Sequence, residues 1–144
     1  MISLREITID NFWDIISLNV SDDQANLVVS NAISIAQSRV QPECIPLGIY
    51  NYDTPVGFIM YCIDRDDGEY WLYRLMIDKR YQGNGYSKEA MNLVLGKIKE
   101  DKTKRRVLLG VDISGKASVK LYESLGFKFN GQVFGKESIM QLDY

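Results

Sequence analysis

The chain has 144 residues, of which 46% are hydrophobic and 25% charged, a size and composition that fit one globular domain over residues 1–144. It contains no histidine, which excludes Ser-His-Asp and Cys-His catalysis and any metal site built on imidazole. The formal net charge of −2, with both signs mixed along the chain, disfavours nucleic-acid binding.

The first ten residues alternate and carry charge, which is typical of a strand and not of a signal peptide. No apolar run approaches the ~18 residues that a membrane-spanning helix needs. Cys44 and Cys62 lie in or beside apolar runs and lack metal-ligand spacing, so we expect reduced core residues. These features favour a cytoplasmic protein with no membrane span and no metal ion.

The first part of the chain predicts one strand and two helices, over residues 2–9, 10–18 and 21–39. Asp10 is expected to cap the first helix, and Ser21 with Gln24 has the pattern of a capping box for the second. The expected buried side of the second helix recurs at helical spacing and comprises Leu27, Val28, Ala32, Ile35 and Ala36.

The rest of the chain predicts six more strands and two more helices, with Gly126 where a helix C-cap belongs. The strands are expected at 47–50, 56–63, 69–77, 106–113, 127–130 and 137–142, the last two paired as a hairpin, and the helices at 87–100 and 116–125. The order β-α-α-β-β-β-α-β-α-β-β predicts an α/β (α+β) fold with a mixed, largely antiparallel central sheet flanked by helices.

Charge is divided unevenly between the two halves of the chain. Residues 1–73 hold 3 basic and 11 acidic side chains, a balance of −8, whereas residues 74–144 hold 14 basic and 8 acidic ones, a balance of +6. The split indicates either two solvated faces or two partners of opposite charge. The second alternative gains weight if the chemistry requires both an anion and a cation.

A glycine-rich turn between an apolar strand and a helix is the strongest local signal. It consists of Gln82, Gly83, Asn84, Gly85, Tyr86 and Ser87, flanked by Lys79, Arg80 and Lys88. Glycines let the backbone approach a ligand closely, and a helix N-terminus attracts anions. The turn predicts a phosphate or pyrophosphate site, although it matches neither the dinucleotide fingerprint nor a phosphate loop. By itself the motif leaves a purely structural turn open.

A second motif follows about 35 residues later and runs Leu121-Tyr122-Glu123-Ser124-Leu125-Gly126-Phe127. A lone tyrosine in such a helix is usually a packing residue. Together, however, the two motifs resemble the GNAT superfamily of N-acetyltransferases, which carries Gln/Arg-x-x-Gly-x-Gly/Ala at the first site and Leu-Tyr-x-x-x-Gly-Phe at the second. Residues 71–78 and 126–131 look most like bacterial spermine/spermidine acetyltransferases.

The resemblance implies a transferase that uses acetyl-CoA as co-substrate and acetylates a small cationic amine, in the first place a polyamine. The backbone of Met76 and Ile77 would pair with the pantetheine arm and polarise the thioester carbonyl. The pyrophosphate would be held by the turn from Gln82 to Ser87, with Lys88 beside it. Tyr122 would protonate the leaving thiolate, a role that suits a neutral phenol. A homodimer is implied by the resemblance alone.

Three positions depart from the family's pattern. Ser87 replaces the last Gly/Ala of the first motif. Gly115 stands where many relatives carry an Asn that touches the cofactor. Tyr73 stands where polyamine acetyltransferases often carry Asp or Glu, which could act as the base.

An aliphatic amine has a pKa near 10.4, so it arrives protonated and must lose a proton before it attacks. The candidates for this step are Glu69, Asp112 and Tyr73, each of which could equally be an ordinary strand or surface residue. Backbone N–H groups near Met76 would stabilise the developing oxyanion.

Carboxylates of the N-terminal half are expected to attract the acceptor, because separated carboxylates suit a polycation such as spermidine. They are Asp22, Asp23, Glu43, Asp64, Asp66, Asp67 and Glu69. A solvated acidic turn is the alternative. Other acceptors left open are an amine-bearing antibiotic and a protein N-terminus, and a non-catalytic acetyl-CoA sensor is the alternative outside the enzymes.

Overall fold

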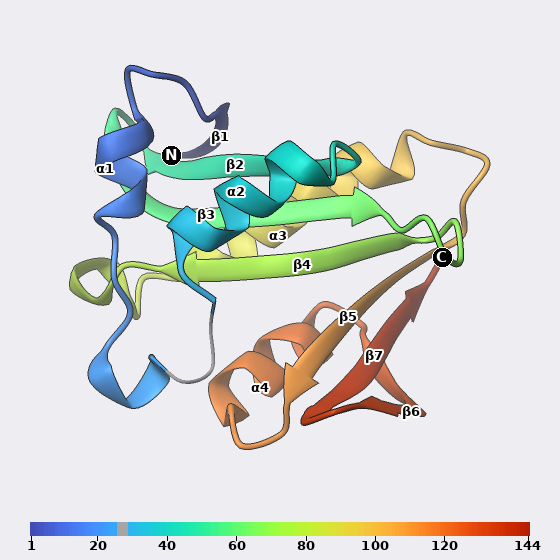
Figure 1. Cartoon of the computed structure of the whole chain (residues 1–144). Helices are drawn as coiled ribbons and strands as arrows, with labels where there is room; N and C mark the ends of the chain where they lie inside the picture. Colours follow the sequence, from blue (N-terminus) through green and yellow to red (C-terminus); the bar gives the residue numbers. More distant parts are fainter. Residues whose placement is uncertain (26–28) are drawn as a thin grey trace.

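A single seven-stranded sheet forms the centre of the protein in a computed structural model that describes residues 1–25 and 29–144 (Figure 1). The strand order is β1-β2-β3-β4-β5-β7-β6, and every neighbouring pair is antiparallel except β4 and β5. The predicted fold class is therefore confirmed. The strands are β1 Ile2–Glu6, β2 Cys44–Asn51, β3 Thr54–Ile63, β4 Tyr70–Ile77, β5 Arg106–Asp112, β6 Lys128–Phe134 and β7 Glu137–Asp143.

Helices cover both faces of this sheet. They are α1 Phe12–Ile16, α2 Asn31–Val40, α3 Tyr86–Lys99 and α4 Lys116–Ser124, with short 3₁₀ turns η1 Asp22–Gln24 and η2 Lys79–Tyr81. Helices α1 and α2 lie on one face, over β2 and β3, whereas α3 lies on the other (Figure 1). In the described part of the chain, no helix is long and apolar enough to cross a membrane.

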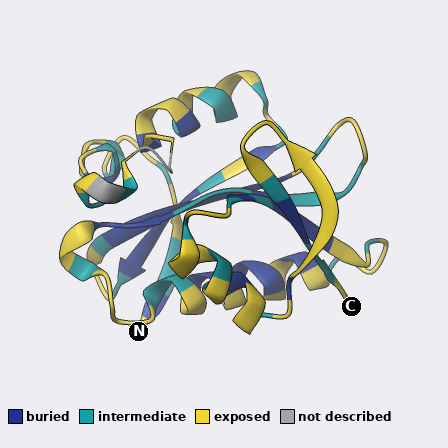
Figure 2. Ribbon diagram, turned by 90° about the horizontal axis from the view of Figure 1, so that it is seen from below, coloured by how far each residue is buried: buried dark blue, intermediate teal, exposed yellow. Residues whose placement is uncertain are grey.

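Two apolar clusters result, one on each face, because side chains alternate along a strand. The larger lies under α3 and α4 and includes Ile49, Val94, Leu109 and Phe127. The smaller lies under α1 and α2 and includes Phe58. Figure 2 shows the buried strands between helices whose outer sides are exposed.

Strands β4 and β5 are paired over three residues only. Tyr70–Leu72 of β4 lies beside Val107–Leu109 of β5, and beyond these residues the two strands separate (Figure 1). A bulge in β4 at Tyr73 adds one residue opposite β3, and bulges bend and twist the strand that carries them. The far half of β4, residues 73–77, therefore has β3 on one side and an opening on the other.

The expected helix over 21–39 is wrong in its start and in its buried side. Ser21 precedes only the 3₁₀ turn η1, and α2 begins at Asn31, where the Ser30 hydroxyl accepts a hydrogen bond from the Ile33 N–H at 3.2 Å. The residues of α2 that are fully buried are Asn31 and Ser34. Of the expected apolar side, Ala32 and Ala36 are exposed, Ile35 is half-buried, and Leu27 and Val28 lie outside the described residues.

The polar inner side of α2 has a direct physical reason. Asn31 donates to the Ile15 carbonyl at 2.9 Å, and Gln37 accepts from the Arg74 guanidinium at 3.0 Å. The helix therefore covers polar groups on β4 and not only an apolar core. Other boundaries shift slightly, since β1 ends at Glu6 and Asn11, not Asp10, precedes α1.

Asp78 follows directly after β4 and is only 2% exposed. Its hydrogen bonds connect the end of this strand to Asn19 and to Arg80. Its carboxylate accepts hydrogen bonds from the Asn19 N–H at 3.0 Å, from the Arg80 N–H at 2.9 Å and from the Arg80 guanidinium at 2.8 Å. Burial by itself would raise the pKa of Asp78, but these hydrogen bonds outweigh it and lower the pKa below its usual value. Asp78 thus fixes the end of β4 to the turn that follows it.

We expect Asp78→Asn to lower the free energy of unfolding by about 1.5–3 kcal/mol at neutral pH, since it removes charge-assisted hydrogen bonds to a buried group. Because the folded pKa is lowered, the stabilisation is present above the ordinary pKa of about 4 and disappears as the pH falls through the folded value. Urea unfolding at several pH values measures the difference between wild type and variant.

Asp53→Asn is the matched control, because Asp53 pairs with Arg5 at 2.9 Å but its side chain is 98% exposed. Such a surface pair contributes at most about 1 kcal/mol. An Asp78→Asn difference that stayed constant from pH 7 to pH 2 would contradict the assignment.

Candidate active site

A cleft of about 610 Å³ opens where β4 and β5 separate. Its walls are residues 73–77 of β4, the turn after η2, the start of α3, the inner side of α4 and the end of β5. Val29, just before α2, and Asn31, the first residue of α2, line the side of the cleft toward that helix. The cleft thus follows from the sheet topology and is open to both faces of the sheet.

One wall offers an unpaired strand edge. Met76 and Ile77 line the cleft and pair with Phe58 and Gly57 of β3 on their other side. Beyond Leu72, no strand of the described chain pairs with the β5-facing edge of β4. Its backbone groups are available to hydrogen-bond an extended ligand, because strand N–H and C=O groups alternate between the two edges.

The glycine-rich turn forms the end of the cleft. Gly83 and Gly85 have φ values of +84° and +78°, a conformation that disfavours any residue with a Cβ. Gly85 is also the N-cap of α3, a 14-residue helix, so unpaired N–H groups and a partial positive charge lie at the cleft. The turn residues lining it are Gln82, Gly83, Gly85, Tyr86, Ser87 and Lys88.

Two side chains of the turn hold its shape. The Gln82 amide donates to the Ile77 carbonyl at 2.9 Å, and the Asn84 amide donates to the Tyr81 carbonyl at 2.9 Å. Asn84 does not line the cleft, unlike the other turn residues of the predicted set. Lys116, at the start of α4, adds a second positive charge beside Lys88.

Tyr122 lies on the cleft side of α4 and is 8% exposed. Its ring packs edge-on against Phe127, with centroids 5.9 Å apart, which fixes its position. Burial, and then the negative charge of Glu137, raise the pKa of Tyr122 above its usual value. The phenol therefore stays protonated at physiological pH, and its hydroxyl makes no hydrogen bond to any residue of the described chain.

Tyr73 lines the cleft from the bulge of β4, on the side facing α2. Its hydroxyl donates to the Asp64 carboxylate at 2.7 Å. Burial, together with hydrogen bonding to Cys62 and Asp64, raises the pKa of Tyr73 above its usual value. The phenolate is therefore not accessible near neutral pH.

The carboxylates named as candidate bases occupy different places. Glu69 lies before β4, at the end of that strand remote from Ile77, and the structure does not bring it into the cleft. Asp112 lines the cleft, but it accepts hydrogen bonds from the Ser114 N–H and hydroxyl at 2.9 and 2.8 Å. These bonds lower the pKa of Asp112 and make it a weaker base.

The acidic residues expected to attract the acceptor also lie outside the described cleft lining. Asp64 is bound by Tyr73, and Asp67 accepts from the Trp71 indole at 2.8 Å. Glu43 pairs with Arg65 at 3.4 Å. The side chain of Asp23 lies outside the described part of the chain.

Asn31 and Glu137 are among the cleft residues that were missed in the sequence. Asn31 lies on the buried side of α2 and reaches Met76, with its amide nitrogen 3.7 Å from the sulfur. Glu137 begins β7 and lines the cleft near Tyr122. No local motif marks either residue, because each reaches the site through long-range packing. Within the described chain, no group of three His, Cys, Asp or Glu side chains could hold a metal ion.

An unpaired strand edge, a helix N-terminus suited to an anion and a neutral phenol in one cleft are the features expected of an acyltransferase that takes its acyl group from coenzyme A. The strand edge suits an extended pantetheine arm, and the turn with Lys88 and Lys116 suits a pyrophosphate. The model of the Acetyltransferase (GNAT) family matches residues 12–127, and the chain belongs to this family. It is an acetyl-CoA-dependent N-acetyltransferase.

Known proteins agree with this assignment. The chain is 30% identical to a spermine/spermidine N(1)-acetyltransferase of Bacillus subtilis (strain 168), over 96% of each chain. Its fold is similar to that of the PaiA N-acetyltransferase of Thermoplasma acidophilum in complex with coenzyme A (TM-score 0.74, 20% identity, 100% and 99% coverage). It is also similar to that of the Vibrio cholerae spermidine N-acetyltransferase in complex with CoA and spermine (TM-score 0.74, 15% identity, 97% and 92% coverage).

We expect Gly85→Ala to weaken the binding of CoA several-fold and to destabilise the fold by about 1 kcal/mol, because a Cβ at positive φ strains the turn. Gly96→Ala, in the last turn of α3, is the control, since its added Cβ meets no atom within 4 Å outside the backbone of its own helix. That change should stabilise α3 by about 0.5–1 kcal/mol and leave CoA affinity unchanged. Calorimetry measures the affinity for CoA, and thermal unfolding measures the stability. Equal CoA affinities in the two variants would contradict the role of the turn.

Proposed function

We propose that the protein transfers the acetyl group of acetyl-CoA to a primary amine of a polyamine such as spermidine or spermine. The observation that carries the proposal is the position of Tyr122, a buried neutral phenol in a cleft that also has an anion-binding turn and a free strand edge. The names of the relatives from B. subtilis and V. cholerae support polyamines as the acceptor class.

The β4 edge and the glycine-rich turn act together on the acyl donor. Backbone groups of Met76 and Ile77 on the free edge of β4 bind the pantetheine arm and polarise the thioester carbonyl. The turn from Gln82 to Ser87, with Lys88, binds the pyrophosphate. This arrangement directs the thioester toward the narrow part of the cleft, where β4 and β5 separate.

Tyr122 serves as the general acid. When the amine nitrogen forms its bond to the acetyl carbon and the C–S bond breaks, Tyr122 donates its proton to the leaving thiolate. The raised pKa ensures that the proton is present at neutral pH. A proton must also leave the attacking ammonium.

Tyr73 and Asp64 provide a route for that second proton. Tyr73 lines the cleft and its hydroxyl donates to Asp64, so in this proposal the hydroxyl takes a proton from a bound water while passing its own to the carboxylate. This relay needs no phenolate to accumulate, which fits the raised pKa of Tyr73. Glu69 has no part in it.

We expect Tyr122→Phe to lower kcat by about 10²- to 10⁴-fold, the usual contribution of a general acid, and to leave CoA affinity unchanged. Tyr70→Phe is the control, because the Tyr70 hydroxyl donates to Asp101 at 3.0 Å outside the cleft lining. Release of free thiol from acetyl-CoA gives the rate. A Tyr122→Phe enzyme as fast as the Tyr70→Phe enzyme would remove Tyr122 from the reaction and favour a sensor of acetyl-CoA.

The acceptor is tested by incubating the protein with acetyl-CoA and a panel of spermidine, spermine, putrescine, lysine and aminoglycosides. Acetylated spermidine or spermine, identified by mass, is the expected product. If only an antibiotic or a peptide N-terminus reacts, the polyamine assignment is wrong and the acetyltransferase assignment stands.

A further inference from the structure

Glu137 lies over the backbone of β5 at the mouth of the cleft. It is the register partner of Asp112 across β5 and β7, and its carboxylate leans over Gly110. An added Cβ at Gly110 would stand only 2.7 Å from a Glu137 carboxylate oxygen. The missing side chain at position 110 thus provides the space that Glu137 occupies.

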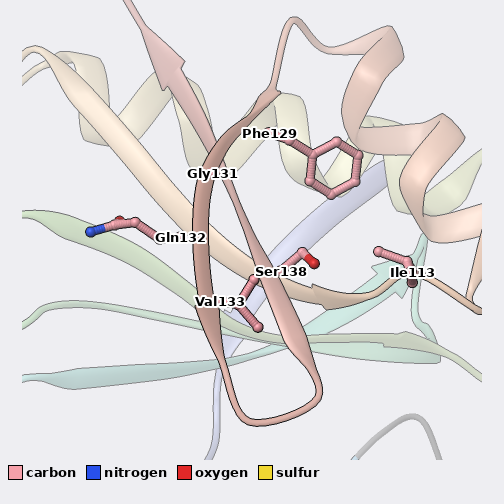
Figure 3. A pocket seen from close by; sticks show the side chains of 6 residues that line it. All are labelled: Ile113, Phe129, Gly131, Gln132, Val133 and Ser138. Atoms are coloured by element: carbon pink, nitrogen blue, oxygen red, sulfur yellow. The ribbon is translucent and has the colours of Figure 1, made fainter.

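The face on which Glu137 lies follows from strand alternation. Its neighbour Ser138 faces a separate, mainly apolar hollow of about 230 Å³ beneath β6, together with Phe129 and Val133 (Figure 3). Leu109 and Val111, on either side of Gly110, point into the core that contains Tyr122. Glu137 and Gly110 therefore belong to the opposite face, the one covered by α1 and α2.

That face is where an acceptor must enter. The glycine-rich turn and α3 place the acyl donor toward the other side of the sheet, and Tyr73 and Asn31 line the cleft on this one. An amine that approaches the thioester opposite Tyr122 passes between these residues and Glu137.

A carboxylate without a hydrogen-bonding partner distinguishes Glu137 from Asp112, the other described acid that lines the cleft. Asp112 and Glu137 are the acidic residues among the described residues that line the cleft. The Asp112 carboxylate is held by Ser114, whereas the Glu137 carboxylate has no hydrogen bond or ion pair to any residue that the structure describes. The cationic lining residue on the acceptor side, Arg74, is bound to Gln37 and to the Tyr73 carbonyl.

We propose that Glu137 binds the ammonium group that carries the reacting nitrogen and thereby selects cationic acceptors. This inference rests on the proposed function only in requiring an amine acceptor. A carboxylate and an ammonium form a short, charge-assisted hydrogen bond, and the partly enclosed cleft weakens its screening by water. Glu137 and Tyr122 line the same cleft, so an ammonium bound by Glu137 shares that cleft with the proposed general acid.

The same geometry argues against the acidic β3–β4 turn as the anchor of this ammonium. Asp64 and Asp67 already bind Tyr73 and Trp71, and neither lines the cleft. Asp64 acts on the acceptor only through Tyr73.

Steady-state kinetics with the full chain test the proposal with three variants. Glu137→Gln should raise the KM for the acceptor about 10- to 100-fold, leave the KM for acetyl-CoA unchanged, and change kcat by less than about threefold. Glu137→Asp should recover part of the loss. Gly110→Ala, which displaces the carboxylate without removing its charge, should raise the acceptor KM as well.

Asp143→Asn is the matched control, because Asp143 lies on the same strand, and in register with Arg106 on β5, but outside the cleft lining. It removes the same charge and should leave every parameter unchanged. The amines are spermidine, spermine, an aminoglycoside and the monoamine propylamine, the last of which has only the reacting ammonium to bind.

The outcomes separate this inference from the proposed function. If spermidine is acetylated but Glu137→Gln behaves like Asp143→Asn, the role of Glu137 is overturned and the polyamine proposal stands. If another amine is the substrate and its KM rises in Glu137→Gln, the role of Glu137 is supported and the polyamine proposal falls. If wild type acetylates none of the amines and calorimetry shows none binding beside CoA, both are overturned.

Discussion

The short pairing of β4 with β5 is the constraint on which the rest of the site depends. Parallel strands cannot be joined by a tight turn, so the chain must cross over one face between them, and η2, the glycine-rich turn and α3 form that crossover. The start of α3 is therefore brought to the end of β4 by topology. Since β4 and β5 separate after Leu72, the same topology leaves a free strand edge beside a helix N-terminus. A ligand with an extended arm and a pyrophosphate fits both.

The separation of the strands also explains why polar residues are buried around the cleft. A sheet that opens in its middle loses the apolar partners that would normally cover its residues there. Asp78 and Asn31 take their place, the first through Asn19 and Arg80, the second through the Ile15 carbonyl. Both side chains are less than 5% exposed, and each has hydrogen-bonding partners, which is the condition for burying such groups at low cost.

A helix or a site residue could be predicted from the sequence where its position depends on neighbouring residues, and not where it depends on long-range packing. Gly85 and Gly126 adopt positive φ and mark the start of α3 and the end of α4, so these elements could be placed from the sequence. The start and the buried side of α2 could not, because the apolar spacing over 21–39 matched a core helix whereas the sheet beneath α2 presents Arg74, which donates to Gln37 of that helix. Glu137 was missed for a different reason. In the sequence it is an ordinary charged residue of a hairpin, and its place depends on β7 lying beside β5 and on the space at Gly110.

The uneven charge of the two halves has a different meaning in the folded chain from the one expected. The basic half supplies Lys88 and Lys116 to the donor side of the cleft, which suits polyanionic CoA. The described carboxylates of the acidic half do not supply the matching acceptor charge, because none of them lines the cleft. Instead, the unpaired carboxylate in the cleft is that of Glu137, in the basic half. Net charge along the chain thus governs long-range attraction, whereas in the role that we propose for Glu137 a single carboxylate holds the reacting ammonium.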